Sequence, residues 1–161
     1  MDRKKFMGSA LALMMTPRLL PAMQGLEIQS SQDENACSTP PWLRKGDCIA
    51  IVSPSGTIKR EDIQPAVDKL QEWGFRVKVG DSVGKKDFTR GGTDEERASD
   101  LQQQLNDVDV KAILCARGGY GLVRIIDRID FSPLKKHPKW IIGFSDATVL
   151  HSHIKIGRAH V

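Results

Sequence analysis

The chain has 161 residues, of which 40% are hydrophobic and 27% are charged. This balance is typical of one soluble globular domain and argues against a disordered, collagen-like or multi-span membrane protein. The formal net charge of +4 belongs to the two ends, because residues 1–25 carry +3 and residues 155–161 carry +2, which leaves −1 for residues 26–154. The body has no basic excess that would attract phosphate backbones, so we expect no nucleic-acid partner.

The three cysteines, Cys37, Cys48 and Cys115, are not expected to form a disulfide framework, because their number is odd. The sequence has no CxxC spacing and no Cys/His cluster, so we expect no metal site. Cys48 and Cys115 lie in apolar runs and are predicted to be small buried hydrophobic residues. Cys37 lies in a polar stretch, where a lipid anchor is disfavoured because residues 34–36 are too polar for that signal.

The N-terminus has the pattern of an export signal, with a basic stretch at 2–5 followed by ten apolar residues at 6–15. We therefore predict a signal peptide over residues 1–25 and a polar linker over 26–39. The apolar stretch is too short to span a bilayer as a mature helix, so no stable membrane span is expected. The start also resembles a twin-arginine signal, which would place the protein in the periplasm; the alternative is a retained leader on a cytoplasmic protein.

From residue 40 onward, short apolar runs alternate with segments of helical periodicity. Strands are predicted at 48–52, 75–79, 112–115 and 140–142. Helices are predicted at 63–73, 94–106, 122–128 and 148–154. The helix after Thr93 has a capping-box pattern, with Glu96 three residues beyond the cap. This alternation predicts an α/β fold in which a parallel sheet is flanked by helices on both faces.

Three loops follow predicted strands and therefore lie at the carboxyl edge of the sheet, where ligands bind in such folds. The loops are 53–56, 117–121 and 143–147. Ser53 and Ser55 lie in the first of them. They are candidates for substrate binding by position alone, and the alternative is a loop that only turns the chain.

Ser145 lies in a Gly-x-Ser-x-Ala pattern between a predicted strand and a predicted helix, which is close to the nucleophile elbow of hydrolases. Small residues at Gly143 and Ala147 suit a tight turn, because larger side chains would collide where strand and helix cross. Such a turn would expose the Ser145 hydroxyl and direct the N–H of Asp146 toward a developing oxyanion. The alternative is a serine that only caps the following helix.

The loop at 117–121 reads Arg-Gly-Gly-Tyr-Gly, and its glycines allow close backbone approach and leave N–H groups free. One interpretation is a phosphate cradle, although the spacing matches neither the dinucleotide-binding motif nor a P-loop. A second is that Gly118 or Gly119 supplies another oxyanion donor, and a third is a tight turn without a ligand. Arg117 either clamps a substrate carboxylate or pairs with an acidic neighbour, and Tyr120 is a further candidate for substrate contact.

None of the four histidines is expected to act as the general base for Ser145. His151 and His153 follow on the same predicted helix, whose geometry carries them away from the exposed turn. His137 lies in a polar loop and His160 lies near the end of the chain.

Three segments together carry a resemblance to a known family. They are 40–56 (PPWLRKGDCIAIVSPSG), 115–121 (CARGGYG) and 142–151 (IGFSDATVLH). In this order, they make residues 40–154 resemble the N-terminal domain of the LD-carboxypeptidases, also called muramoyltetrapeptide carboxypeptidases. The resemblance implies a Rossmann-like or flavodoxin-like domain.

This family consists of serine peptidases with a Ser-Glu-His triad. The resemblance implies that Ser145 is the nucleophile and that the N–H groups of Asp146 and of Gly118 or Gly119 form the oxyanion hole. It also implies cleavage of the amide before the terminal D-Ala of murein tetrapeptides, with no metal and no cofactor. The implied partners are a murein peptide substrate and, for the full-length protein, a second copy in a homodimer.

The family's Glu and His lie in a C-terminal domain that this sequence is expected to lack, so the chain alone is predicted to be inactive. Residues 155–161 are predicted to be a non-native tail, because 156–161 is the in-frame translation of a common sequencing-library adapter. Three alternatives remain at this point: a related hydrolase that inactivates peptide-nucleotide antibiotics, a nucleotide-binding module, and a non-catalytic peptidoglycan-binding domain.

Overall fold

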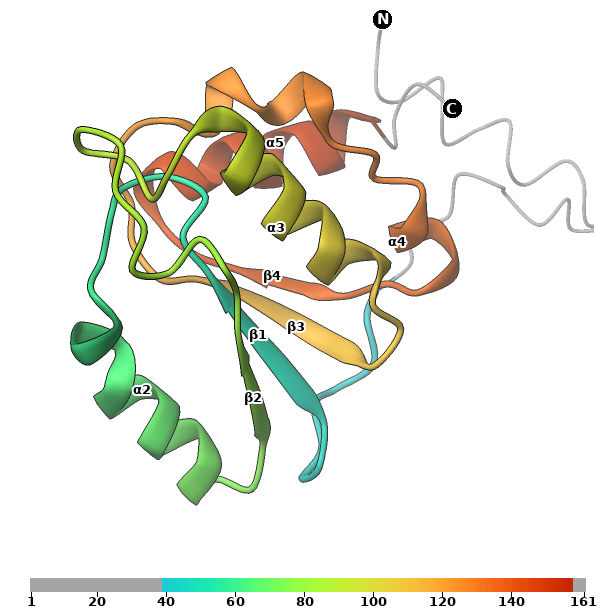
Figure 1. The fold of residues 1–161 in the computed structure, drawn as a ribbon. Helices are drawn as coiled ribbons and strands as arrows, with labels where there is room; N and C mark the ends of the chain where they lie inside the picture. Colours follow the sequence, from blue (N-terminus) through green and yellow to red (C-terminus); the bar gives the residue numbers. More distant parts are fainter. Residues whose placement is uncertain (1–38, 158–161) are drawn as a thin grey trace, which may run out of the picture. The chain divides into compact units, whose positions relative to one another are not determined.

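The computed structural model describes residues 39–157, with side chains through residue 155. A four-stranded parallel sheet lies at its centre, in the order β2-β1-β3-β4 (Figure 1). The strands are β1 (Cys48–Val52), β2 (Arg76–Val79), β3 (Val110–Cys115) and β4 (Trp140–Ile142). The parallel α/β fold and the four predicted strands are therefore confirmed.

Several predictions about the ends of the chain lie outside the described residues. These are the signal peptide, the linker up to residue 38, Cys37 and His160. Export to the periplasm therefore stays a prediction. Within residues 39–157, no helix is both long enough and apolar enough to cross a bilayer.

The two faces of the sheet are covered by different helices. Helix α2 (Arg60–Glu72) covers one face, whereas α3 (Asp94–Asn106) and α5 (Thr148–Gly157) cover the other (Figure 1). Strand β1 is buried along its whole length because it lies between two strands and faces an apolar cluster on each side. Alternate residues serve the two clusters: Ala50 and Val52 pack toward α3 and α5, and Ile51 packs toward α2.

Helix α3 begins with the predicted capping box. Thr93 Oγ1 accepts a hydrogen bond from the Glu96 N–H at 3.2 Å, and the Glu96 carboxylate accepts one from the Thr93 N–H at 2.9 Å. Two backbone donors that the helix itself leaves unpaired are thereby satisfied. The first turn of α3 thus has a fixed position at the carboxyl edge of the sheet, where Arg97 of the same helix contacts the loops after β1 and β3.

Between β3 and β4 the structure differs from the prediction in detail. The expected helix over 122–128 consists of two 3-10 turns, η1 (Leu122–Arg124) and η2 (Ile126–Arg128). Leu122, Ile125 and Ile126 are all buried, and in a 3-10 turn residues three apart lie on the same side. A short helix α4 (Pro133–Lys136) follows that was not predicted, although a proline in the first turn is a recognised helix start.

We predict that Thr93→Ala lowers the free energy of unfolding by about 1 kcal/mol, because it removes the side-chain acceptor of the capping box. Urea denaturation of the chain measures this change. Ser99→Ala, at an exposed position of the same helix, is the control and should alter stability little. Equal stability of Thr93→Ala and the unmodified chain would contradict the proposed contribution of the cap.

Candidate active site

Three loops meet at the carboxyl edge of the sheet, as the sequence predicts. The 53–56 turn follows β1, the 117–121 loop follows β3 and the 143–147 turn follows β4. The first two loops are joined where the Gly56 N–H donates to the Gly118 carbonyl at 3.1 Å. The last two touch where Gly118 lies against Ser145. The most conspicuous side chain at this edge is that of Ser145.

Ser145 lies at a sharp turn between β4 and α5. Its φ is +58°, a left-handed conformation that costs a non-glycine residue of order 1–3 kcal/mol. Its side chain is exposed, and Oγ donates no hydrogen bond to any residue in 39–157. The Ser145 carbonyl, by contrast, accepts from Thr148 Oγ1 at 2.7 Å. The hydroxyl therefore stands free at the edge and does not act as a helix cap.

Small residues allow this turn, for the reason expected from the sequence. A Cβ added to Gly143 would lie 2.6 Å from Ala147 Cβ and 3.0 Å from Cys115 Cβ. The first distance is shorter than real contacts between unbonded carbon atoms, and the second is at their tight limit. A side chain at position 143 would therefore push β4 away from the following turn and displace Ser145.

Gly118 brings the backbone of the second loop against Ser145. A Cβ on Gly118 would lie 2.9 Å from Ser145 Cβ and 3.3 Å from Ser145 Oγ. The N–H groups of Gly118, Gly119 and Asp146 have no acceptor among the described residues, so they are free to donate. Free N–H groups beside an exposed nucleophile are the donors that an oxyanion requires.

The Asp146 carboxylate holds the turn at Ser145 to the segment that follows the 117–121 loop. Its Oδ2 accepts a hydrogen bond from the Leu122 N–H at 2.9 Å, and Leu122 is fully buried. Asp146 thereby offers its N–H to the site while its side chain fixes the spacing between two of the loops.

Packing within the protein explains why the 117–121 loop contains glycines, so a bound phosphate is not needed to account for them. A Cβ on Gly119 would lie 3.0 Å from the Cα of Gly56, and one on Gly121 would lie 2.7 Å from Nη1 of Arg97. Both residues also have positive φ, +132° and +155°, which side chains disfavour. These glycines are required because protein atoms already occupy the space beside them.

Arg97 is a buried residue that no motif in the sequence indicates. Its Nη1 donates to the carbonyls of Gly121, at 3.0 Å, and of Pro54, and its Nε donates to the Gly92 carbonyl at 3.2 Å. Asp94 pairs with the remaining nitrogen, Nη2. Burial lowers the pKa of Arg97, and the Asp94 carboxylate opposes that shift. One guanidinium thus joins the loops after β1 and β3 to the start of α3.

Ser53 and Ser55 are close to the site but do not face it. Both side chains are fully buried. Ser53 Oγ donates to the Gly56 carbonyl at 2.6 Å, and Ser55 Oγ has no partner among the described residues. A substrate reaches exposed groups, so direct contact with these two hydroxyls, as considered from the sequence, is not supported by their placement.

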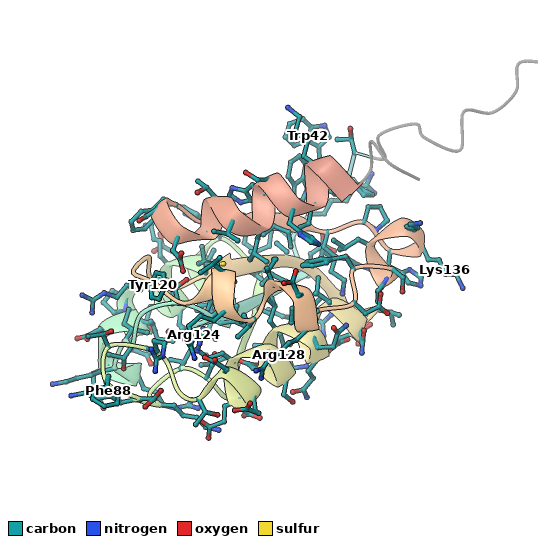
Figure 2. The ribbon with its side chains drawn as sticks, turned by 90° about the horizontal axis from the view of Figure 1, so that it is seen from above. Trp42, Phe88, Tyr120, Arg124, Arg128 and Lys136 are labelled. Atoms are coloured by element: carbon teal, nitrogen blue, oxygen red, sulfur yellow. The ribbon has the colours of Figure 1, made fainter. Side chains whose placement is uncertain are left out.

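Arg117 and Tyr120 are exposed at this edge, as substrate-binding residues must be. Arg117 Nη1 donates to the Thr57 carbonyl at 3.0 Å, which orients the guanidinium and leaves Nη2 available for a carboxylate. The Tyr120 side chain is 60% exposed. Tyr120 lies at one end of the domain and Lys136 lies at the other (Figure 2).

The described histidines do not form a catalytic pair with Ser145. His151 Nε2 lies 3.1 Å from the Ile141 carbonyl, and the ring of His153 packs against Phe131 with centroids 5.1 Å apart. His137 lies beside a pocket at the amino edge of the sheet. Within residues 39–157, no three His, Cys, Asp or Glu side chains gather as a metal site.

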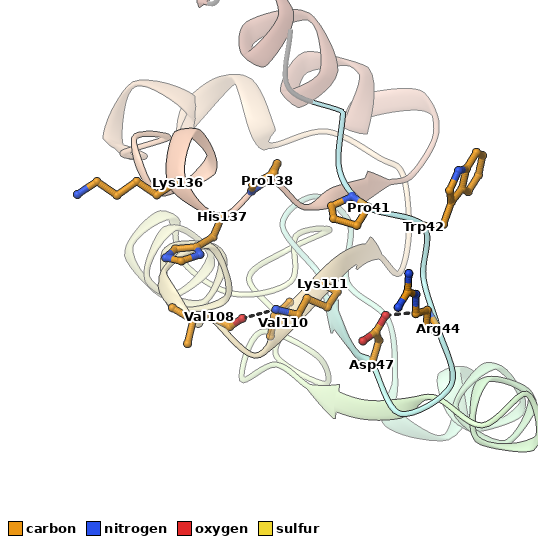
Figure 3. A pocket seen from close by; sticks show the side chains of 10 residues that line it. All are labelled: Pro41, Trp42, Arg44, Asp47, Val108, Val110, Lys111, Lys136, His137 and Pro138. Atoms are coloured by element: carbon orange, nitrogen blue, oxygen red, sulfur yellow. Dashed lines mark hydrogen bonds between the residues drawn. The ribbon is translucent and has the colours of Figure 1, made fainter. Parts of the chain in front are cut away.

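That pocket at the amino edge has a volume of about 430 Å³ (Figure 3), and Ser145 is not among its lining residues. Pro41, Trp42 and Pro138 are among its apolar residues, and Lys111 and Lys136 are among its charged residues. Lys111 Nζ is already bound to the Val108 carbonyl at 2.9 Å. Because the nucleophile candidate lies at the opposite edge, this hollow is not the site that the motifs predict.

An exposed serine in a strained strand-to-helix turn, with free backbone N–H groups beside it, is the arrangement of a serine hydrolase nucleophile. The comparisons with known proteins make the class specific. The family model for the LD-carboxypeptidase N-terminal domain matches residues 49–159. The chain therefore belongs to the LD-carboxypeptidase family of hydrolases, as the three sequence motifs indicated.

Known relatives agree with this assignment. The chain is 40% identical to the probable murein peptide carboxypeptidase of Bacillus subtilis (strain 168) over 115 residues, which are 71% of this chain and 36% of the relative. A solved muramoyltetrapeptide carboxypeptidase from Oxalobacter formigenes is 32% identical, with a TM-score of 0.57, and the match covers 64% of this chain and 34% of that structure.

A second solved structure is a mutant of the microcin C7 self-immunity protein MccF in complex with adenosine monophosphate. It is 30% identical, with a TM-score of 0.69, and the match covers 76% of this chain and 37% of that structure. The chain thus spans about a third of the length of the relatives that it matches.

Cys115 provides a test of the packing beneath the turn at Ser145. Burial raises the pKa of its thiol to about 12, and the Asp146 charge adds to this shift. At pH 9 the reactive thiolate is then on the order of one part in a thousand. We predict that iodoacetamide leaves Cys115 unmodified in the folded chain at pH 9 and modifies it in urea, as read by peptide mass spectrometry.

An exposed cysteine introduced by Ser152→Cys is the control for this experiment, and it should react under native conditions. Rapid modification of Cys115 in the folded chain would show that the contact among β3, Gly143 and Ala147 is open in solution.

Proposed function

We propose that this chain carries the nucleophile of a serine LD-carboxypeptidase that releases the terminal D-Ala from murein tetrapeptides. The observation that carries the proposal is Ser145, exposed at a φ of +58° with Gly118 in contact beside it. Family membership and the name of the Bacillus subtilis relative, a probable murein peptide carboxypeptidase, support the choice of substrate.

In the proposed reaction, Ser145 Oγ gives its proton to the general base and adds to the carbonyl carbon of the amide between the L-centre of diaminopimelate or lysine and D-Ala; the base later gives this proton to the leaving amine. The N–H groups of Asp146 and of Gly118 or Gly119 stabilise the negative charge that develops on the carbonyl oxygen. The C–N bond then breaks and D-Ala leaves with a proton on its amine. Water hydrolyses the remaining ester and restores the serine.

Recognition of a chain terminus requires a group that binds its carboxylate. We propose that Arg117 has this role, because its guanidinium is exposed and is oriented by the Thr57 carbonyl. Tyr120 is proposed to flank the same substrate residue. Both come from the loop that supplies Gly118, so substrate binding and oxyanion stabilisation would be set by one segment.

The general base is proposed to come from outside residues 39–157. Within these residues, His151 is bound to a backbone carbonyl of β4 and His153 packs against Phe131, so neither is hydrogen bonded to Ser145. A serine without a base is poorly activated. The 161-residue chain alone is therefore proposed to be inactive, and the complete gene product is the form to assay.

A second candidate is hydrolysis of an aminoacyl or peptidyl nucleotide, which the similarity to the AMP-bound MccF structure favours. The chemistry at Ser145 would be the same, and only the leaving group would differ. Release of D-Ala from a murein tetrapeptide, measured beside cleavage of an aspartyl sulfamoyl adenosine or a comparable nucleotide, decides between the two.

We predict that Ser145→Ala in the complete gene product lowers kcat/KM for a murein tetrapeptide by about a thousandfold or more, because it removes the attacking oxygen. A fluorophosphonate probe should label the unmodified protein at Ser145 and should not label the variant. Ser152→Ala, at an exposed serine on the following helix, should keep both activity and labelling.

Retention of activity in Ser145→Ala, or labelling at another residue, would contradict the proposed nucleophile. Turnover by the unmodified 161-residue chain would contradict the proposal that this chain alone is inactive.

A further inference from the structure

A buried polar group behind the site has no part in the reaction described so far. Asp100 is on α3 and is 3% exposed. Its Oδ2 accepts hydrogen bonds from the Ser82 N–H, at 2.9 Å, and from the Ser82 hydroxyl, and its Oδ1 accepts from Gln104 Nε2 at 3.1 Å. A carboxylate buried with three donors is held in one position.

The hydrogen bonds continue from Asp100 to the turn after β1. Ser82 Oγ, which donates to Asp100, accepts from the Ser53 N–H at 2.8 Å. Glycines allow this close packing: a Cβ on Gly80 would lie 2.5 Å from Asp100 Oδ1, and one on Gly91 would lie 2.4 Å from the Ser53 carbonyl oxygen. The start of the 53–56 turn is thus fixed against two neighbouring segments.

From Ser53 the hydrogen bonds reach the site itself. Ser53 Oγ donates to the Gly56 carbonyl at 2.6 Å, and the Gly56 N–H donates to the Gly118 carbonyl at 3.1 Å. Gly118 is the residue in contact with Ser145. Each step uses a buried or backbone group, so an unbroken series of hydrogen bonds runs from Asp100 to the residue that faces the nucleophile.

The same turn is held on its other side by Arg97. Its Nη1 donates both to the Pro54 carbonyl in the turn and to the Gly121 carbonyl in the loop that contains Gly118. The 53–56 turn and the 117–121 loop are therefore connected twice, once through Gly56 and once through the guanidinium.

We propose that the 53–56 turn positions the oxyanion donors, with Ser53 as the positioning residue and Ser82 and Asp100 as its anchor. This inference rests on the proposed function. The peptide between Gly118 and Gly119 is planar, so a bond that fixes the Gly118 carbonyl on Gly56 also fixes the direction of the Gly119 N–H. Loss of the bond frees that peptide to rotate, because both residues are glycine.

The test uses the complete gene product with Ser53→Ala, which removes one buried hydroxyl and creates no steric conflict. We expect kcat for the murein tetrapeptide to fall by about tenfold to a hundredfold, since a small misplacement of a stabilising group has effects of this size. KM should change little, and fluorophosphonate labelling of Ser145 should slow in proportion, because both reactions place an oxygen between the same donors.

Lys139→Met is the matched control for general destabilisation. Lys139 is also a buried polar residue, and its Nζ donates to the Gln104 carbonyl at 2.9 Å and to the Asp107 carbonyl. This variant should lose stability and keep kcat and labelling rate. If Lys139→Met lowers kcat as much as Ser53→Ala does, the effect of Ser53 is only structural and the proposal is overturned.

Asp100 supplies a conservative comparison. Asp100→Asn keeps an oxygen that accepts from Ser82, and the Gln104 amide can turn its otherwise unpartnered Oε1 toward the new amide group, so most of kcat should remain. Asp100→Ala removes the acceptor and should match Ser53→Ala. Equal kcat in both Asp100 variants would contradict the proposed anchor.

The proposal and the proposed function fail in different ways. If Ser145→Ala retains activity, the nucleophile assignment is wrong. If Ser145→Ala is inactive but a folded Ser53→Ala keeps normal kcat, only the positioning role is wrong. Should Ser53→Ala not fold, Ser82→Ala breaks the same series of bonds; failure of both to fold while Lys139→Met folds would show that the turn serves stability and overturn the proposal.

Discussion

The close approach of Gly118 to Ser145 is the constraint on which the site depends. There is no room for a Cβ at position 118, because it would collide with Ser145 Cβ. The left-handed turn at Ser145 leaves its hydroxyl exposed beside this contact. Unpaired N–H groups are costly when buried, but in the proposed reaction they are the donors for the charge that develops on the substrate oxygen. In the proposed reaction, the strained turn supplies the nucleophile and the glycine backbone supplies the oxyanion donors.

The proposed oxyanion hole has to be rigid, because it acts only when its donors already point at the reacting oxygen. Glycine-rich loops are intrinsically mobile, so rigidity must come from their surroundings. In this domain it comes from buried polar groups, namely the Arg97 guanidinium with its three backbone carbonyls and the bonds that begin at Asp100. Buried charges of this kind contribute little net stability by themselves. Their better-suited role is to fix the positions of the loops that they bind.

The sequence predicted the architecture well, because the signals for it are local. Apolar runs marked the strands, the Thr93 and Glu96 pattern marked the start of α3, and the small residues at Gly143 and Ala147 marked the nucleophile turn. Each depends on residues that are neighbours along the chain. The 3-10 form of 122–128 was missed because helical periodicity does not distinguish it from an α-helix over so few residues.

The support of the site could not be predicted in the same way. Arg97 follows Asp94, Glu95 and Glu96 in a helix of low apolar content, where an arginine is ordinarily exposed. Its burial depends on carbonyls at Pro54, Gly92 and Gly121, which only the folded chain brings together. The Ser53 and Ser55 hydroxyls illustrate the same limit, since their position next to the site was evident from the sequence but their orientation was not.

The most direct test of this account is a crystal structure of the complete gene product after reaction with a fluorophosphonate. We expect phosphorus bound to Ser145 Oγ and the phosphonyl oxygen about 3 Å from the backbone nitrogen of Asp146 and from that of Gly118 or Gly119. An adduct on another residue, or a phosphonyl oxygen that faces solvent with neither backbone nitrogen near it, would contradict the account.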